Sequence, residues 1–208
     1  MLDLRARVGE HRVIAILRGV PAWHAVTLAH HLQRAGIRML EVAFSDDHGE
    51  SALRAIQAEL GDDLMLGAGT VTDLERARAA QAAGASFLLT PHLVPEVNAF
   101  AVGQGLGLIS GAMTPTEIQQ ARAQGSAVVK LFPAGDLGVG YLKSLLGPYP
   151  DLPLLVVGNI HAGNFGEFLK AGALGAGIGS YLTQTDWTNP DFDGLERRAR
   201  SLLAGPPQ

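Results

Sequence analysis

Short apolar runs alternate with amphipathic stretches along almost the whole chain. Such runs, several of which end at glycine, serine or proline, are typical of strands buried in a parallel sheet, and the stretches between them have helical spacing. We expect eight strands, at residues 12–18, 38–44, 64–68, 86–90, 106–110, 127–132, 153–157 and 175–178. We expect eight helices, at residues 22–35, 49–60, 72–83, 94–103, 115–124, 138–146, 162–171 and 191–203.

Eight strand–helix units in this order predict an α/β fold, a small (β/α)8 TIM barrel. The chain of 208 residues has room for one large core, so we expect a single domain over residues 1–208 with a frayed tail at 204–208. The alternative is an open doubly wound sheet, which usually has fewer units and a glycine-rich loop after its first strand. The stretch LRGVPAW at 17–23 is not such a loop.

The composition narrows the classes of partner. Hydrophobic residues make up 47% of the chain and charged residues 17%, which fits a compact α/β protein. A net charge of −4 without a run of lysine and arginine argues against nucleic acid or an acidic membrane surface, so we expect a small-molecule partner. The absence of cysteine excludes disulfides and a thiolate nucleophile. No apolar run reaches about 18 residues and the first residues lack the apolar core of a signal peptide, so we expect a cytoplasmic protein.

Lys130 stands in the middle of the apolar strand SAVVKLFPA at 126–134. A charged amine in such a strand costs free energy unless it is paired or loses its proton. One interpretation is a lysine that reaches water at a strand end or joins a buried structural ion pair. The other is a nucleophilic amine.

The alternation of side chains along a strand predicts which residues face the barrel interior. Lys130 shares a face with Val128 and Phe132, and by the same alternation Glu41 and Arg18 face inward from their own strands. Three ionisable side chains inside one barrel are too costly unless they face each other or a ligand. We therefore expect these three residues to form a site.

The types of these residues suggest aldol chemistry without a metal. Burial disfavours a charged lysine, so more of the Lys130 amine is free to attack a carbonyl and form a Schiff base. Glu41 could remove a hydroxyl proton, directly or through one water, as a carbon–carbon bond breaks. The alternative is that Lys130 and Glu41 form only a buried ion pair.

Glycine-rich turns end three of the predicted strands: GAGT at 67–70, VGNI at 157–160 and GIGS at 177–180. The last two follow strands seven and eight, where barrels of this class often hold a phosphate on backbone N–H groups. Glycine at a single barrel corner is often purely geometric. The pairing of the two turns predicts a phosphate site.

The seven histidines do not suggest a metal site. His30 and His31 are adjacent, and no pair has the i, i+4 spacing with a nearby glutamate that helical zinc sites use. His92, at the end of strand four, either reaches the mouth of the barrel or lies on the surface.

Several motifs resemble those of the 2-keto-3-deoxy-6-phosphogluconate and 4-hydroxy-2-oxoglutarate aldolase family. They occur in the family's order over roughly residues 10–182: LEV at 40–42, GAGTV at 67–71, LTP at 89–91, VVKLFPA at 128–134, VGNI at 157–160 and GIGS at 177–180. The resemblance implies a class I, metal-independent aldolase of (β/α)8 form that needs no cofactor and is usually a homotrimer. It implies that Lys130 forms the Schiff base with pyruvate and that Glu41 is the general acid/base.

The resemblance also implies a substrate site. The stretch IAILRG at 14–19 is most similar to the 6-phosphogalactonate branch, in which the arginine, here Arg18, lies at the substrate. Thr70 would lie near the pyruvyl carboxylate. The residues near the phosphate would be Gly158, Asn159, Gly179 and Ser180.

Two positions depart from the family pattern. The gluconate branch has an arginine four residues after the glutamate, where this chain has Ser45, and Asn159 stands where the family usually has a second glycine. A side chain at Asn159 could narrow or re-aim the phosphate pocket.

The expected activity is cleavage of 2-dehydro-3-deoxy-6-phosphogalactonate, or its gluconate epimer, to pyruvate and glyceraldehyde 3-phosphate. Two alternatives stay open. One is a 4-hydroxy-2-oxoglutarate aldolase, which gives pyruvate and glyoxylate. The other is a barrel that binds phosphate or a keto acid without turnover.

Overall fold

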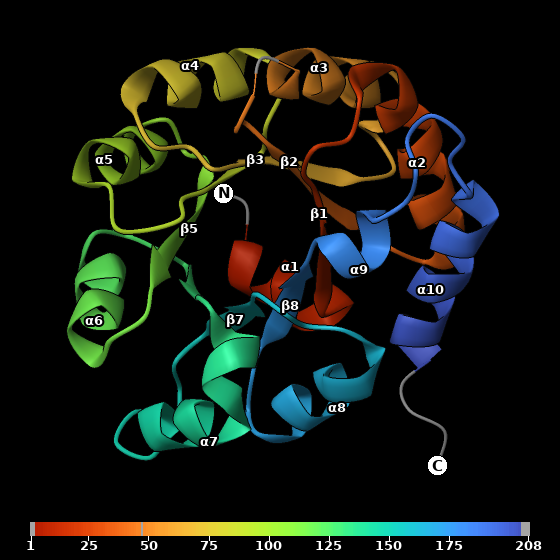
Figure 1. The fold of residues 1–208 in the computed structure, drawn as a ribbon. Coiled ribbons are helices and arrows are strands. Elements are labelled where there is room, and N and C mark those ends of the chain that lie inside the picture. Colours follow the sequence, from red (N-terminus) through yellow and green to blue (C-terminus); the bar gives the residue numbers. More distant parts are fainter. Residues whose placement is uncertain (1–2, 47, 205–208) are drawn as a thin grey trace.

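The computed structural model describes residues 3–46 and 48–204, which form a closed parallel barrel surrounded by helices (Figure 1). The strands follow one another around the barrel in chain order, and β1 closes the ring by pairing with β8. The expected (β/α)8 class is confirmed.

The strands lie where the sequence predicts them, with slightly shifted ends: β1 Val13–Leu17, β2 Met39–Ala43, β3 Met65–Gly69, β4 Phe87–Leu89, β5 Gly107–Ala112, β6 Val128–Leu131, β7 Leu154–Val157 and β8 Gly175–Ile178. The helices are α1 Leu4–His11, α2 Ala22–Ala35, α3 Gly49–Leu60, α4 Leu74–Ala82, α5 Pro95–Gly103, α6 Pro115–Ala123, α7 Ala134–Leu146, α8 Ala162–Lys170, α9 Ser180–Thr183 and α10 Phe192–Ala204.

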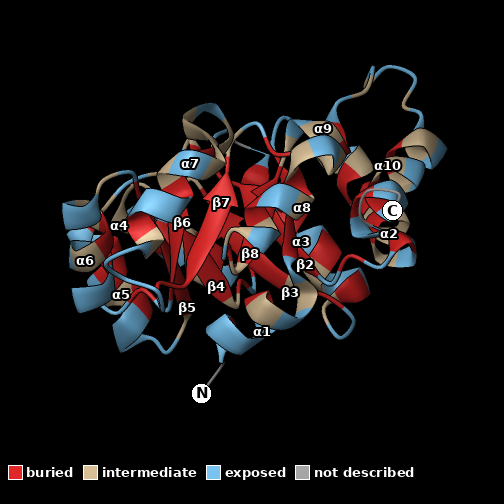
Figure 2. Cartoon of the chain, turned by 90° about the horizontal axis from the view of Figure 1, so that it is seen from below, coloured by how far each residue is buried: buried red, intermediate tan, exposed pale blue. Residues whose placement is uncertain are grey.

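Alternation along the strands sorts the buried side chains into two layers. Residues of one parity, such as Ala15 and Val129, pack between the strands and the outer helices. Residues of the other parity, such as Ile14, Met39 and Val128, form a separate cluster inside the barrel. The strands are buried on both faces (Figure 2), which explains why they read as continuous apolar runs.

The expectation of eight helices is wrong for the described residues, because α1 and α9 are additional. In α1 only Leu4 and Val8 are buried, and both join the cluster inside the barrel. Two apolar positions one turn apart are a weak helical pattern, so α1 could not be predicted from the sequence. Figure 2 shows α1 at one end of the barrel and α9 at the other. Thus α1 closes the base, and α9 lies at the mouth.

Two details of the helices match local sequence signals. Thr114 caps α6 in a capping box with Glu117, and Pro115 occupies the first helical position. Within α7 the backbone leaves the helical region at Gly138, with φ 80° and ψ 167°, which is where the sequence predicts the helix to begin.

At the carboxyl end of the described chain, Ala204 still belongs to α10. The other positions of the expected tail, 205–208, lie outside the described residues. None of the helices in the described part is long and apolar enough to cross a membrane.

Candidate active site

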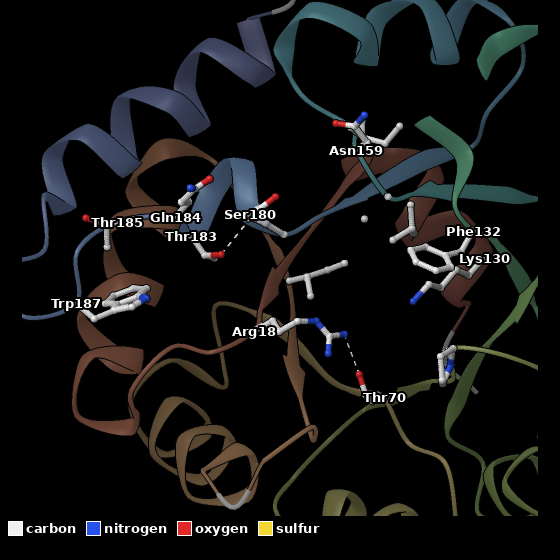
Figure 3. A pocket seen from close by; sticks show the side chains of 17 residues that line it. Arg18, Thr70, Lys130, Phe132, Asn159, Ser180, Thr183, Gln184, Thr185 and Trp187 are labelled. Carbon is white, nitrogen blue, oxygen red and sulfur yellow. Dashed lines mark hydrogen bonds between the residues drawn. The ribbon is translucent and has the colours of Figure 1, made fainter. Parts of the chain in front are cut away.

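A cavity of about 630 Å³ opens at the carboxyl ends of the strands (Figure 3). Residues that follow five of the strands line it: Arg18 after β1, Thr70 after β3, Phe132 after β6, Gly158 after β7 and Gly179 after β8. This end of a (β/α)8 barrel is where substrates bind in enzymes of the fold.

Lys130 projects from β6 into this cavity and is only 5% exposed. Its partner in the parallel pairing with β5 is Gly111, which has no side chain to cover it. The amine lies 5.2 Å from the centre of the Phe132 ring, within the range of a cation–π interaction. The inward direction predicted for Lys130 is confirmed. Phe132 follows the last residue of β6 and is 45% exposed, but it lines the same cavity as Lys130.

Glu41 is fully buried in the barrel, as the alternation predicts. Neither carboxylate oxygen has a hydrogen-bond partner among the described residues. Glu41 is not among the residues that line the cavity. It pairs in register with Gly67 of β3, and its carboxyl group lies against Gly69 of the same strand.

Burial shifts the two buried ionisable groups in opposite directions. Desolvation raises the pKa of Glu41, and the positive charges of Lys130 and Arg18 oppose that rise. Desolvation lowers the pKa of Lys130, the Glu41 charge opposes the fall, and Arg18 adds to it. At a given pH the Lys130 amine is therefore more often neutral, and the Glu41 carboxyl group more often protonated, than either group would be in water.

Arg18 lies one residue beyond the end of β1 at Leu17, so the strand alternation does not fix the direction of its side chain. The side chain is exposed at the mouth of the barrel, where it lines the cavity. Its Nη2 donates a hydrogen bond of 2.9 Å to Oγ1 of Thr70. Thr70 has a positive φ of 58°, a conformation that a β-branched residue rarely adopts, and its side chain is directed to the mouth (Figure 3). The two residues thus lie together, as predicted, at the cavity.

The predicted phosphate residues also lie together. Gly158 and Asn159 after β7, and Gly179 and Ser180 after β8, all line the same cavity. Asn159 has a φ of 53°, so asparagine fills a left-handed position that glycine adopts most easily. Its side-chain amide donates a 3.2 Å hydrogen bond to Asp136 and is thereby held toward α7.

Two other candidate positions lie away from this cavity. Ser45 lines a different cavity, of about 380 Å³, together with acidic residues that include Asp46 and Asp73. His92 is exposed and does not line the cavity at Lys130, so the surface interpretation of this histidine is the correct one. Lys130 and Arg18 are thus the charged side chains that line the cavity in the described part of the chain.

Sequence reasoning missed the far wall of the cavity. Thr183 in α9 and Gln184, Thr185 and Trp187 in the following loop line it (Figure 3). The Trp187 carbonyl oxygen lies 3.2 Å from Nε2 of His24, and the rings of these two residues stack at 5.8 Å. No motif marks this loop, so only the folded chain identifies it.

A group of one histidine and two acidic residues could not be predicted from the histidine spacing. His31 of α2 lies close to Asp193 and Glu196 of α10, a group with the donor atoms of a metal site. Arg200 and Arg34 both donate to Glu196, and these contacts together with His31 lower its pKa to about 2. The group is accounted for as an ion-pair network that joins the two helices.

The fold is a (β/α)8 barrel, and the buried Lys130 opens on a cavity at the carboxyl ends of its strands. A family model described as "Aldolase: KDPG and KHG aldolase" matches residues 4–197. The chain belongs to this aldolase family, as its motifs predict.

Similar proteins carry related names. The chain is 38% identical over 183 residues to a 2-dehydro-3-deoxy-phosphogluconate aldolase of Treponema pallidum, covering 88% of this chain and 87% of that protein. It is 33% identical to the 2-dehydro-3-deoxy-6-phosphogalactonate aldolase of Escherichia coli, covering 82% and 83%. A solved structure named "Native KDPGal structure" superposes with a TM-score of 0.87 at 30% identity, covering 92% of each chain.

Proposed function

We propose that the protein is a class I, metal-independent aldolase that cleaves a 2-keto-3-deoxy-6-phosphosugar acid to pyruvate and glyceraldehyde 3-phosphate. The observation that carries this proposal is the buried Lys130 amine, whose pKa is lowered and which opens on the cavity that Arg18 lines. A free amine is the form that attacks a ketone. Relatives named for the gluconate and the galactonate substrates both support the class.

The mechanism begins when the Lys130 amine adds to the C2 ketone and water leaves, which gives a protonated imine. The C4 hydroxyl proton passes to Glu41 as the C3–C4 bond breaks, and the bond's electrons move into the imine to form an enamine. Reprotonation at C3 and hydrolysis then release pyruvate and restore the amine. Because the Glu41 carboxyl group does not line the cavity, we propose that one water carries its proton.

The polar ends of the substrate need different partners. Arg18 and Thr70 are hydrogen-bonded to each other at one side of the mouth, which suits the carboxylate of the sugar acid. We assign the phosphate to the turns at Gly158–Asn159 and Gly179–Ser180, which offer backbone N–H groups. Ser45, which stands where the gluconate branch has an arginine, lines a different cavity and brings no positive charge to the substrate.

A galactonate substrate is our first choice because IAILRG at 14–19 resembles that branch. A 4-hydroxy-2-oxoglutarate aldolase is the second candidate, since the family model includes both activities in its description and such a substrate would use Lys130 without needing a phosphate. A barrel that binds a keto acid without turnover is the third, and the lowered pKa of Lys130 argues against it. The homotrimer implied by the family resemblance remains part of the proposal.

A coupled assay with lactate dehydrogenase tests the substrate by measuring pyruvate release from the galactonate and gluconate phosphates and from 4-hydroxy-2-oxoglutarate. The variant Ser180→Asp places a like charge beside the assigned phosphate, so we expect kcat/KM to fall at least about tenfold on the phosphorylated substrates only. Ser180→Asn is the matched neutral control. An equal loss of kcat/KM on all three substrates in Ser180→Asp would show that the turn after β8 does not bind the phosphate. That result would favour a 4-hydroxy-2-oxoglutarate aldolase.

A further inference from the structure

Two inward positions of β3 are occupied by glycine, and the space that each leaves is filled differently. At Gly67 a Cβ atom would overlap the ring of Phe87. At Gly69 it would overlap the carboxyl group of Glu41, reaching Oε1 and Cδ and coming within 2.6 Å of Cγ. The Glu41 side chain therefore occupies the volume that any other residue at position 69 would need.

The absence of a side chain at Gly69 leaves the space in which the Glu41 carboxyl group lies. The group is fully buried, and no hydrogen bond from the described residues fixes either oxygen. With no hydrogen bond from the described residues, the carboxyl group is held by the packing around it and by its attraction to Lys130 and Arg18. The next residue, Thr70, lines the cavity, so the surface of β3 against which Glu41 lies is continuous with the cavity wall.

We infer that Gly69 is a positioning residue: it provides the space in which the Glu41 carboxyl group lies within proton-transfer range of the substrate. The inference rests on the proposed function, because it concerns the proton carrier of that reaction. Gly69 does not touch the reacting atoms and acts only through Glu41. Any side chain at position 69 would move the carboxyl group and slow carbon–carbon cleavage without removing the Lys130 amine.

A double-mutant cycle between positions 41 and 69 tests this inference. Gly69→Ala should lower kcat for cleavage by about 10²-fold, the scale of a misplaced acid–base group, while KM changes little and borohydride still traps pyruvate on Lys130. It should also lower the melting temperature, because the new methyl group overlaps the carboxyl group.

The variant Glu41→Ala removes the three atoms nearest to the new methyl group. In that background the change Gly69→Ala should cause no further loss of kcat and should no longer lower the melting temperature. The matched control is Gly67→Ala on the same face of the same strand, where the new methyl group meets Phe87 instead. Its effects should be the same with and without Glu41→Ala.

Each outcome bears on the inference. If Gly69→Ala keeps the parental kcat, Gly69 does not act through Glu41. The same conclusion follows if Gly69→Ala lowers kcat by the same factor in the Glu41→Ala background as in the parent. If Gly69→Ala does not fold while the double variant does, the inference is supported; if neither folds, the methyl group meets something other than Glu41 and the inference is overturned. The melting temperatures test the packing even if the parent protein neither traps nor releases pyruvate, a result that would instead overturn the proposed function.

Discussion

The base and the mouth of the barrel interior are built from the same eight strands but are filled in opposite ways. At the base, Leu4 and Val8 of α1 pack with inward side chains such as Phe87 in an apolar cluster. Toward the mouth, Lys130 opens on a cavity and Glu41 is buried without a hydrogen bond. Burial of apolar surface at the base stabilises the fold, whereas desolvation of ionisable groups at the mouth destabilises it.

Because the base and the mouth are filled differently, substitutions in the two regions should have different effects. In barrels of this class the mouth carries the reactive groups and the opposite end serves stability. We therefore expect changes at the mouth to alter rates and pH profiles, and changes at the base to alter the free energy of unfolding.

The largest effect is expected at Glu41. The variant Glu41→Gln keeps the size of the side chain but cannot exchange the proton, so kcat for cleavage should fall by a factor on the order of 10²–10⁴. Imine formation with pyruvate should continue. Trapping and cleavage are measured on the same preparation; cleavage at the parental rate would make Glu41 a structural partner of Lys130 only.

At the base, Leu4→Ala should lower the free energy of unfolding by about 2–5 kcal/mol, because Leu4 is 1% exposed inside the barrel cluster. Urea unfolding measures the loss, and kcat per folded molecule should stay close to the parental value. Leu203→Ala is the matched control, since Leu203 is 38% exposed on α10, and its loss should be clearly smaller. Equal losses in the two variants would show that α1 does not close the core.

The smallest effects are opposite shifts of a pH profile. The neutral Lys130 amine is the reactive form, so the rate of imine formation at saturating pyruvate should rise with pH through the lowered pKa of Lys130. Glu41 raises this pKa and Arg18 lowers it, so Glu41→Gln should move the profile to lower pH and Arg18→Ala to higher pH.

The control for this shift is Arg54→Ala, because Arg54 pairs with Glu50 on the outer helix α3. Its profile should coincide with that of the parent. Shifts in the same direction for Glu41→Gln and Arg18→Ala would contradict the electrostatic account of the mouth.

Side-chain directions could be predicted from the sequence more accurately inside the barrel than at its mouth. Side chains alternate strictly within a strand, so the inward positions of Lys130 and Glu41 could be predicted. Arg18 and Phe132 follow the last residues of β1 and β6, where alternation no longer applies. Both line the cavity with Lys130, but they are exposed at its mouth and are not enclosed in the barrel. The wall at Trp187 comes from a loop whose path depends on tertiary contacts with His24, and no local pattern encodes it.

The most direct test of the account is borohydride reduction in the presence of pyruvate, followed by peptide mass spectrometry. We expect a reduced pyruvyl adduct on Lys130 and none in Lys130→Met. The other lysines, Lys143 and Lys170, lie on the outer helices α7 and α8 and serve as internal controls. An adduct on either of them instead, or no adduct at all, would contradict the assignment of the buried amine as the nucleophile.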